Sequence, residues 1–439
     1  MSTALLTDRY ELTMLQGALA DGTAGRRCVF EVFTRRLPHG RRYGVLAGTG
    51  RVLEALDDFR FGPEELDWLA AEGVVDDPTL EFLAGYRFTG TVRGYAEGEM
   101  FFPHSPVLTV EGTFAEAVLL ETLVLSILNY DSAIASAASR MTSAAIGRPC
   151  LEMGARRAHE QAAVAAARAA AVAGFAGTSN LEAGRRYGLP TIGTAAHAFT
   201  LLHDDEEAAF AAQVASAGPG TTLLVDTYDV RRGVERAVKA AGPGLGAVRL
   251  DSGDLGVLAQ EVRAQLDGLG ARDTKIVVTS DLDEFAIAAL AVAPVDSYGV
   301  GTSLVTGSGA PTCGMVYKLV AREGADGRLA PVAKASFAKE SVGGRKTAAR
   351  RLDGDGRAVE EVVVGGADEA VRDWVPDGDD LRGLVVPLVV DGAVQPGWTG
   401  PEGVAAATAR HAASREELPR GARRLSADEA ALPTVTRTL

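Results

Sequence analysis

Between Cys150 and Thr302, short apolar runs alternate with segments of helical pattern, and this alternation constrains the fold more than any other feature of the chain. The runs are CLEM, GFAGTS, PTIGTA, TTLLVDT, AVRLDSG, KIVVTSD and VDSYGVGTS. Near-continuous apolar strands separated by helices are typical of a parallel sheet covered on both faces. Seven such units favour an irregular α/β barrel, of the TIM-like kind with about seven parallel strands, over an open sheet.

Nearly every run ends in polar or small residues. They are Glu152, Ser179 with Asn180, Thr194, Asp226, Asp251, Ser280 with Asp281, and Gly299 to Thr302. The active sites of α/β barrels form at the C-terminal ends of the strands. A purely structural barrel has no need of polar residues at each of these ends. The sequence therefore predicts an enzyme whose site lies there.

Composition limits the partners of such an enzyme. The net charge of −14 argues against nucleic acid or an anionic membrane as the main partner. The N-terminus lacks the basic and apolar regions of a signal peptide, and no apolar run approaches membrane-spanning length. Three cysteines without a CxxC motif indicate neither a disulfide framework nor a zinc site. We expect a cytoplasmic enzyme that acts on small molecules.

The rest of the chain has a mixed pattern. Strand-like, helical and turn-rich stretches fill residues 1–130, and strand-and-turn segments return after about residue 325. The last 39 residues are polar and helix-prone. We expect an N-terminal α/β domain over 1–130, a barrel over 131–325 and a helical tail over 401–439.

Two glycine-containing motifs carry candidate chemistry. In GVGTSLVTG, the residues Gly299, Gly301 and Thr302 could bring backbone N–H groups and a hydroxyl to a phosphate, although the same letters also suit a plain turn. In RLDSGDLG, Asp251 and Asp254 suit ribose hydroxyls, Mg²⁺ or a cationic transition state. The alternative for Asp254 is an N-cap of the next helix.

Four further residues extend this set. LVDTYDV repeats the strand-end carboxylate with Asp226. The adjacent Arg156 and Arg157 of EMGARRAHE suit a carboxylate or phosphate, although the pair could also be solvated. His197, in GTAAHAF, lies just past a strand end. A lone histidine is often a hydrogen-bonded core residue, but this position favours a nucleophile or an acid/base.

Together these motifs resemble the nicotinate phosphoribosyltransferase family nearly from end to end. LLTDRYELTMLQGAL, EMGARRAHE, GFAGTSN, GTAAHAF, LVDTYDV, RLDSGDL, GVGTSLVTG and MVYKLV follow in family order. GTAAHAF and RLDSGDL are specific, whereas GVGTS is shared with enzymes acting on nicotinamide or quinolinate. The resemblance implies a type II phosphoribosyltransferase fold, in which about 326–400 completes the N-terminal domain beside the barrel.

The resemblance also implies an activity. The family transfers phosphoribosyl from phosphoribosyl pyrophosphate to nicotinate, giving nicotinate mononucleotide and pyrophosphate in NAD biosynthesis and salvage. It couples this transfer to ATP hydrolysis through a phosphohistidine, with Mg²⁺ present. A homodimer with shared active sites is implied as well, because Tyr10 should reach over the pyridine ring from the partner subunit.

Family matching gives each motif residue a role. His197 should be phosphorylated, and Asp226 and Asp251 should act in catalysis. The expected nicotinate contacts are Tyr10, Thr194, Arg249, Met153 and Arg156, where Met153 stands at a position that often carries a larger apolar residue. The expected phosphoribosyl pyrophosphate contacts are Ser179, Asn180, Gly253, Gly299, Gly301 and Thr302. Asp251 with Asp254 is the expected Mg²⁺ pair.

Two alternatives stay open. The first is a related enzyme taking quinolinate, which would need a more basic pocket and no phosphorylatable histidine, or nicotinamide, which would leave the charge of Arg249 unpartnered. The second is an inactive barrel that binds phosphosugars or scaffolds a partner. Loss of activity would show as missing motif residues, and none is missing.

Overall fold

The computed structural model describes residues 2–334, 342–366, 368–372 and 374–439, and the chain divides into two compact units. Unit 1 consists of residues 1–136 and 310–439, and unit 2 of residues 137–309. Unit 2 is thus one continuous segment, whereas unit 1 is built from both ends of the chain. The long helix α6 (Glu121–Ala144) includes the point of division.

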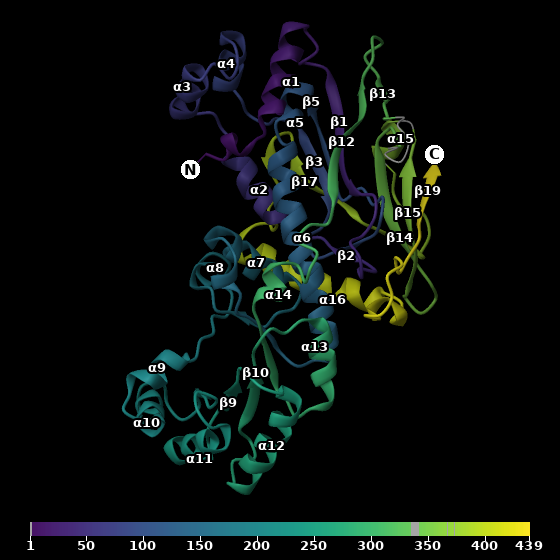
Figure 1. Cartoon of the computed structure of the whole chain (residues 1–439). Helices are drawn as coiled ribbons and strands as arrows, with labels where there is room; N and C mark the ends of the chain where they lie inside the picture. The colour runs from purple at the N-terminus through teal and green to yellow at the C-terminus, as the bar shows by residue number, and fades with distance from the viewer. Residues whose placement is uncertain (1, 335–341, 367, 373) are drawn as a thin grey trace. The chain divides into compact units, whose positions relative to one another are not determined.

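An antiparallel seven-stranded sheet forms the centre of unit 1 (Figure 1). Its strands, in spatial order, are β13 (Leu329–Pro331), β12 (Met315–Glu323), β1 (Arg27–Thr34), β5 (Leu108–Thr113), β3 (Thr91–Tyr95), β17 (Val385–Val390) and β18 (Ala393–Val394). All residues of β1 after Arg27 are buried, because neighbours cover both its edges and both its faces. The sequence boundaries assign β12 to the barrel, but it pairs with β1 in unit 1.

A second sheet of unit 1 comes from the C-terminal part of the chain. Its order is β16 (Leu381–Gly383), β14 (Lys346–Leu352), β15 (Ala358–Gly365) and β19 (Thr434–Thr438), and a two-stranded sheet joins β2 (Gly44–Val45) to β4 (Met100–Phe101). The expected helical tail is a helix only over α16 (Gly400–Glu417). The final TVTRT is rich in β-branched threonine and valine and pairs in parallel with β15.

Helices cover the unit 1 sheets. They are η1 (Ala4–Leu6), α1 (Arg9–Ala20), α2 (Thr49–Asp57), α3 (Pro63–Ala71), α4 (Asp77–Ala84), α5 (Phe114–Val118), α15 (Asp368–Arg372) and η4 (Arg420–Arg423), besides α6 and α16. The core between them is continuous, and within it the rings of Phe30 on β1 and Tyr317 on β12 stack with centroids 4.8 Å apart.

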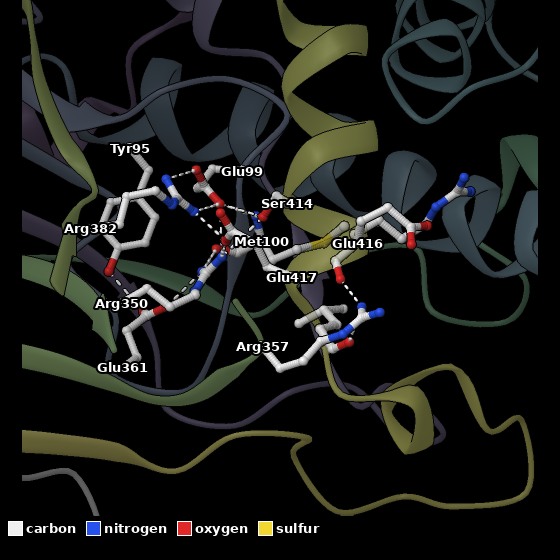
Figure 2. Close-up of polar contacts among 12 residues, drawn as sticks. Tyr95, Glu99, Met100, Arg350, Arg357, Glu361, Arg382, Ser414, Glu416 and Glu417 are labelled. Carbon is white, nitrogen blue, oxygen red and sulfur yellow. Dashed lines mark hydrogen bonds and ion pairs between the residues drawn. The ribbon is translucent and has the colours of Figure 1, made fainter. Parts of the chain in front are cut away.

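A buried guanidinium joins the two halves of unit 1 (Figure 2). Arg350 on β14 has no exposed side-chain surface. Its Nη1 donates to Glu99 at 2.8 Å, and its Nη2 donates to Glu361 at 2.9 Å. Further donors complete the network: Tyr95 and Ser105 donate to Glu361, and Ser414 and Arg382 donate to Glu99. Strands and loops from both ends of the chain, together with α16, meet at this cluster.

The cluster holds Glu99 in its ionised form. Burial alone would raise the pKa of Glu99, but the guanidiniums of Arg350 and Arg382 outweigh burial and lower that pKa to about 2. A carboxylate whose pKa is lowered on folding contributes stability above its ordinary pKa of 4.5. This contribution is therefore present at neutral pH and is lost as the pH falls from 4.5 towards 2.

Unit 2 contains a parallel six-stranded sheet. In spatial order it consists of β7 (Gly177–Thr178), β6 (Cys150–Glu152), β11 (Ser297–Val300), β10 (Lys275–Val278), β9 (Ala247–Leu250) and β8 (Thr222–Leu224). The first strand along the chain, β6, lies beside the last one, β11. This is the strand order of a curled half-barrel that is open between β7 and β8.

The opening corrects the expectation of about seven strands. The run PTIGTA forms no strand; it makes one parallel bridge, from Thr191 to Thr178. Backbone bonds flank the bridge, from Thr178 N–H to Pro190 O and from Ile192 N–H to Thr178 O. After this bridge the chain carries glycine and alanine, whose side chains bury little surface. The hydrogen-bonded pairing of strands therefore does not continue from Thr191 towards β8.

Helices of unit 2 connect its strands. They are η2 (Ala155–Arg157), α7 (Glu160–Val172), α8 (Leu181–Tyr187), α9 (His197–Leu202), α10 (Glu206–Ala217), α11 (Val230–Ala241), α12 (Leu255–Gly268), α13 (Glu284–Ala289), η3 (Leu290–Val292) and α14 (Thr302–Val305). Helices α11, α12 and α13 lie around strands β9 and β10 (Figure 1). Among the described residues, no helix combines the length and the apolar character that crossing a membrane requires.

Replacing Arg350 with methionine should lower the free energy of unfolding by about 3–5 kcal/mol, because Glu99 and Glu361 would stay buried without their cation. Denaturant unfolding measures the difference. Arg351→Met is the matched control, since the next residue of the same strand pairs with Glu360 and Asp380 near the surface and should cost much less. Equal losses in the two variants would contradict this role of Arg350.

Candidate active site

A cavity of about 530 Å³ lies at the C-terminal ends of the unit 2 strands. Every part of its wall comes from this unit: the turn after β6, the end of β7, residues 192–196, and the ends of β9, β10 and β11. The structure brings nine of the predicted site residues together on this wall. They are Met153, Arg156, Ser179, Thr194, Arg249, Asp251, Gly299, Gly301 and Thr302.

Gly299 allows three strand ends to approach one another. A Cβ at this position would lie 2.5 Å from Thr279 Cγ2 and 2.7 Å from Met153 Sδ. Real Cβ atoms do not come so close to other heavy atoms, so a larger residue would push the neighbours apart. Gly299 is therefore required by packing, and the methionine lies against the backbone of β11.

Arg249 projects from β9 into the cavity. Its Nη1 donates to Thr194 Oγ1, which connects the end of β9 to the unpaired segment after Thr191. Its Nε is buried and has no partner among the described residues. Burial lowers the pKa of this guanidinium, and the charge of Arg156 adds to the effect, while Asp251 and Asp226 oppose it. A partly desolvated cation with an unused donor is suited to an anionic ligand.

Carboxylates at the ends of β8 and β9 are linked by hydrogen bonds. Asp226 Oδ2 accepts from the backbone N–H of Asp251 and from the hydroxyl of Ser252, both at 2.8 Å. Thr279 Oγ1 donates to Asp251 Oδ1. The other oxygen of Asp226, Oδ1, is buried and has no hydrogen-bond partner in the described part of the chain.

His197 is the first residue of α9 and its side chain is 40% exposed. Its Nδ1 lies 3.0 Å from the hydroxyl of Thr227, and its Nε2 lies 3.9 Å from Asp226 Oδ1. Ala195 and Ala196 line the cavity, whereas His197 itself lies beyond that wall. The imidazole is thus oriented by the end of β8 and keeps access to solvent.

Glu152 lies beneath the cavity at the end of β6 and is fully buried. Its carboxylate accepts hydrogen bonds from the backbone N–H of Gly154 and from the hydroxyl of Thr178. Burial raises its pKa, and these two donors oppose that rise. Glu152 therefore fixes the turn that carries Met153 and the strand end that carries Ser179.

Three predicted site residues serve the local backbone instead of lining the cavity. Asn180 caps α8 by accepting from Ala183 N–H, and Asp254 caps α12 by accepting from Val257 N–H. Gly253 has a φ of +86°, a conformation that favours glycine in the turn between β9 and α12. The capping alternative considered for Asp254 is the one observed.

The cavity offers Mg²⁺ few protein ligands. In the described ranges there is no group of three or more histidine, cysteine or acidic side chains placed to hold a metal ion. Mg²⁺ commonly uses one or two carboxylates and takes its other ligands from phosphates and water. Asp251 on the cavity wall fits that pattern, whereas Asp254 is not among the lining residues and uses Oδ1 to cap α12.

Sequence reasoning missed two hydroxyls at the site: Thr279 lines the cavity and Thr227 orients His197. Arg157, Ser280 and Asp281 also line the cavity, although the motifs that contain them gave these three residues no individual role. Ser280 has a φ of +139°, which is strained for a residue with a side chain and is typical of functional sites. The run KIVVTSD placed Ser280 and Asp281 at a strand end, which was a usable signal; the hydroxyls of Thr227 and Thr279 gave none.

Tyr10 lies on α1 of unit 1, where its side chain is partly exposed. Burial raises its pKa to about 12, with Glu121 and Glu11 adding to the effect, so the phenol is neutral at physiological pH. Its role towards the base stays a prediction.

Comparison with known proteins points to one family. Residues 5–129 match the family model of the nicotinate phosphoribosyltransferase N-terminal domain, and residues 149–355 match that of the nicotinate phosphoribosyltransferase family. Nicotinate phosphoribosyltransferase pncB1 of Mycobacterium tuberculosis is 58% identical over 98% of this chain and 95% of its own length. The Bacillus subtilis nicotinate phosphoribosyltransferase is 39% identical over 85% of this chain and 78% of its own.

A solved structure extends the similarity to the fold. The crystal structure of human nicotinic acid phosphoribosyltransferase superimposes with a TM-score of 0.82 at 26% identity, covering 98% of this chain and 97% of the human one. The two family models together span most of the chain, and the relative at 58% identity spans almost all of it. The chain therefore belongs to the nicotinate phosphoribosyltransferase family.

Proposed function

We propose that this protein is a nicotinate phosphoribosyltransferase of NAD biosynthesis and salvage, which joins nicotinate to phosphoribosyl pyrophosphate and releases pyrophosphate. Family membership supports the activity. The observation that carries it to the site is that Arg249 and Thr194 line the same cavity as the glycine-containing end of β11. One cavity thus offers both a cation that can bind a carboxylate base and a glycine-containing strand end that can receive a sugar phosphate.

The chemistry needs one bond to break and one to form. The C1–O bond to pyrophosphate breaks with its electron pair leaving on oxygen, and the ring nitrogen of nicotinate donates a pair to C1. Positive charge develops on the ribose, where a fixed carboxylate such as Asp251 stabilises it. Arg249 pairs with the nicotinate carboxylate and Thr194 positions that arginine. Gly301 and Thr302, just after β11, are the residues of this motif that would receive the 5-phosphate.

We further propose that ATP is a co-substrate and that His197 takes its γ-phosphoryl group. A neutral imidazole nitrogen forms the N–P bond, and the bond to ADP breaks. Water later hydrolyses the phosphohistidine. The exposure of the ring, its hydrogen bond to Thr227 and the nearby carboxylate of Asp226 support this role. Mg²⁺, when bound with the substrate phosphates, would neutralise their charge, and Asp251 is the side chain that would hold it.

The quaternary arrangement and location are proposals as well. A homodimer in which Tyr10 completes the partner's site would account for a substrate-contacting motif on unit 1. A cytoplasmic location is what the sequence predicts.

Related bases stay as the second candidates. Nicotinamide has no carboxylate for Arg249, and quinolinate has two carboxylates, for which Arg156 and Arg157 are additional cations on the wall. Assays with the three bases separate these activities, and an inactive phosphosugar-binding protein would turn over none of them.

Arg249→Met should raise the KM for nicotinate far more than the KM for phosphoribosyl pyrophosphate. Removing one partner of a desolvated charged pair typically costs about 2–5 kcal/mol. Steady-state kinetics with each substrate varied in turn provides its own control. Equal effects on both substrates would place Arg249 on phosphate instead.

His197→Asn should abolish the acid-labile, base-stable phosphoprotein that forms from labelled ATP, while the protein stays folded. ATP should then no longer drive nicotinate mononucleotide formation beyond the uncoupled equilibrium. His203 is the matched control, because it lies at the end of the same helix with its Nδ1 2.8 Å from Phe199 O. Label that persists in His197→Asn, or that disappears in His203→Asn alone, would refute the assignment.

Mixing inactive Tyr10→Ala subunits with inactive Asp251→Ala subunits should restore part of the activity. In a hybrid dimer, one of the two shared sites would contain both native residues. Subunit exchange is verified by mass spectrometry of differently tagged copies. Exchange without any recovery of activity would exclude shared sites.

A further inference from the structure

Thr279 lies immediately after β10 and is buried among three strand ends. Its backbone N–H donates to Leu250 O at 2.9 Å, which fixes the residue beside the end of β9. From there its two side-chain branches point to different neighbours. The hydroxyl donates to Asp251 Oδ1, with Leu250 O as a more distant second acceptor at 3.5 Å, and the methyl faces Gly299.

Asp251 is held from two directions as a result. Its backbone N–H donates to Asp226 Oδ2 at 2.8 Å, so the main chain is fixed, and the hydroxyl of Thr279 fixes the carboxylate. Within the described residues, no hydrogen bond reaches Asp251 Oδ2. An aspartate side chain has several χ1 rotamers and a broad χ2 torsion, so a partner is needed to select one orientation. The hydroxyl of Thr279 is that partner, and it leaves Oδ2 of this cavity-lining residue without a protein donor.

We propose that Thr279 is a positioning residue for phosphoribosyl transfer, which acts by orienting the carboxylate of Asp251. The inference rests on the proposed function, because it requires Asp251 to act on the ribosyl group. Hydrogen bonds to charged groups are stronger than those between neutral groups, and a preorganised carboxylate needs no reorientation as charge develops. The effect should therefore fall mainly on kcat and not on the KM of either substrate.

Thr279 could instead matter only for packing, through the methyl that lies against Gly299. The two roles belong to different atoms, so two conservative variants separate them. Thr279→Val keeps the shape and the methyl and loses the hydroxyl. Thr279→Ser keeps the hydroxyl and loses the methyl.

The test measures kcat and both KM values for the wild type and the two variants, with melting temperatures to verify folding. We expect Thr279→Val to lower kcat by about 10- to 100-fold, the range for losing a hydrogen bond to a charged group. Thr279→Ser should stay within about threefold of the wild type, since it restores the donor. Serine as damaging as valine, or valine as active as the wild type, would overturn the proposal.

A double-mutant cycle with Asp251→Asn tests whether the two residues act together. If Thr279 works through Asp251, valine at 279 should add less than about a twofold loss to the residual activity of Asp251→Asn. A further loss as large as in the wild-type background would show an independent role. Wild-type turnover is measured first: an inactive wild type would overturn the proposed function and this inference with it, whereas an active wild type with equal variants would overturn this inference alone.

Discussion

The buried charge of Arg350 is the constraint on which unit 1 depends. A fully buried guanidinium is tolerated only when its charge is compensated, and both terminal nitrogens of Arg350 donate to carboxylates. Glu99 stands 251 residues before it and Glu361 only 11 after it, so one cation is compensated from both halves of the chain. The network cannot form in part without leaving ions desolvated, and this makes the antiparallel sheet, the C-terminal sheet and α16 a single cooperative structure.

Unit 2 depends less on buried charge. Its regular parallel sheet carries irregular turns at the C-terminal ends of the strands. The parallel sheet directs all six C-terminal strand ends to one side, and short links then set the positions of individual groups. Gly299 permits close approach, Glu152 ties two strand ends together, and Thr279 connects a third to Asp251. The shape of the cavity is therefore set mainly by the backbone, and only a few side chains fix the positions of the strand ends.

The sequence predicted the parts of this protein that depend on local pattern. Apolar runs located six strands correctly, and strand-end polarity identified most of the cavity wall. The prediction of a strand at PTIGTA was wrong. Its small residues resemble a strand in sequence but bury too little surface to stabilise pairing. The prediction of a helical tail was wrong for TVTRT, because this segment pairs with β15, a contact that only the tertiary structure supplies. Thr279 was missed because nothing in VVTSD reveals which neighbour a hydroxyl will reach.

The insertion of unit 2 within unit 1 has a consequence for synthesis on the ribosome. All of residues 137–309 have been made before β12 exists, so unit 2 can complete its sheet while β1 still has one open edge. Phe30 has no strand partner on that edge until Leu319 has been synthesised. Glu99 has no ion-pair partner until Arg350 has been synthesised, which is later still. An unpaired strand edge exposes the nascent chain to aggregation. Slow translation between β11 and β14 would lengthen that period, and rapid translation there would protect the protein.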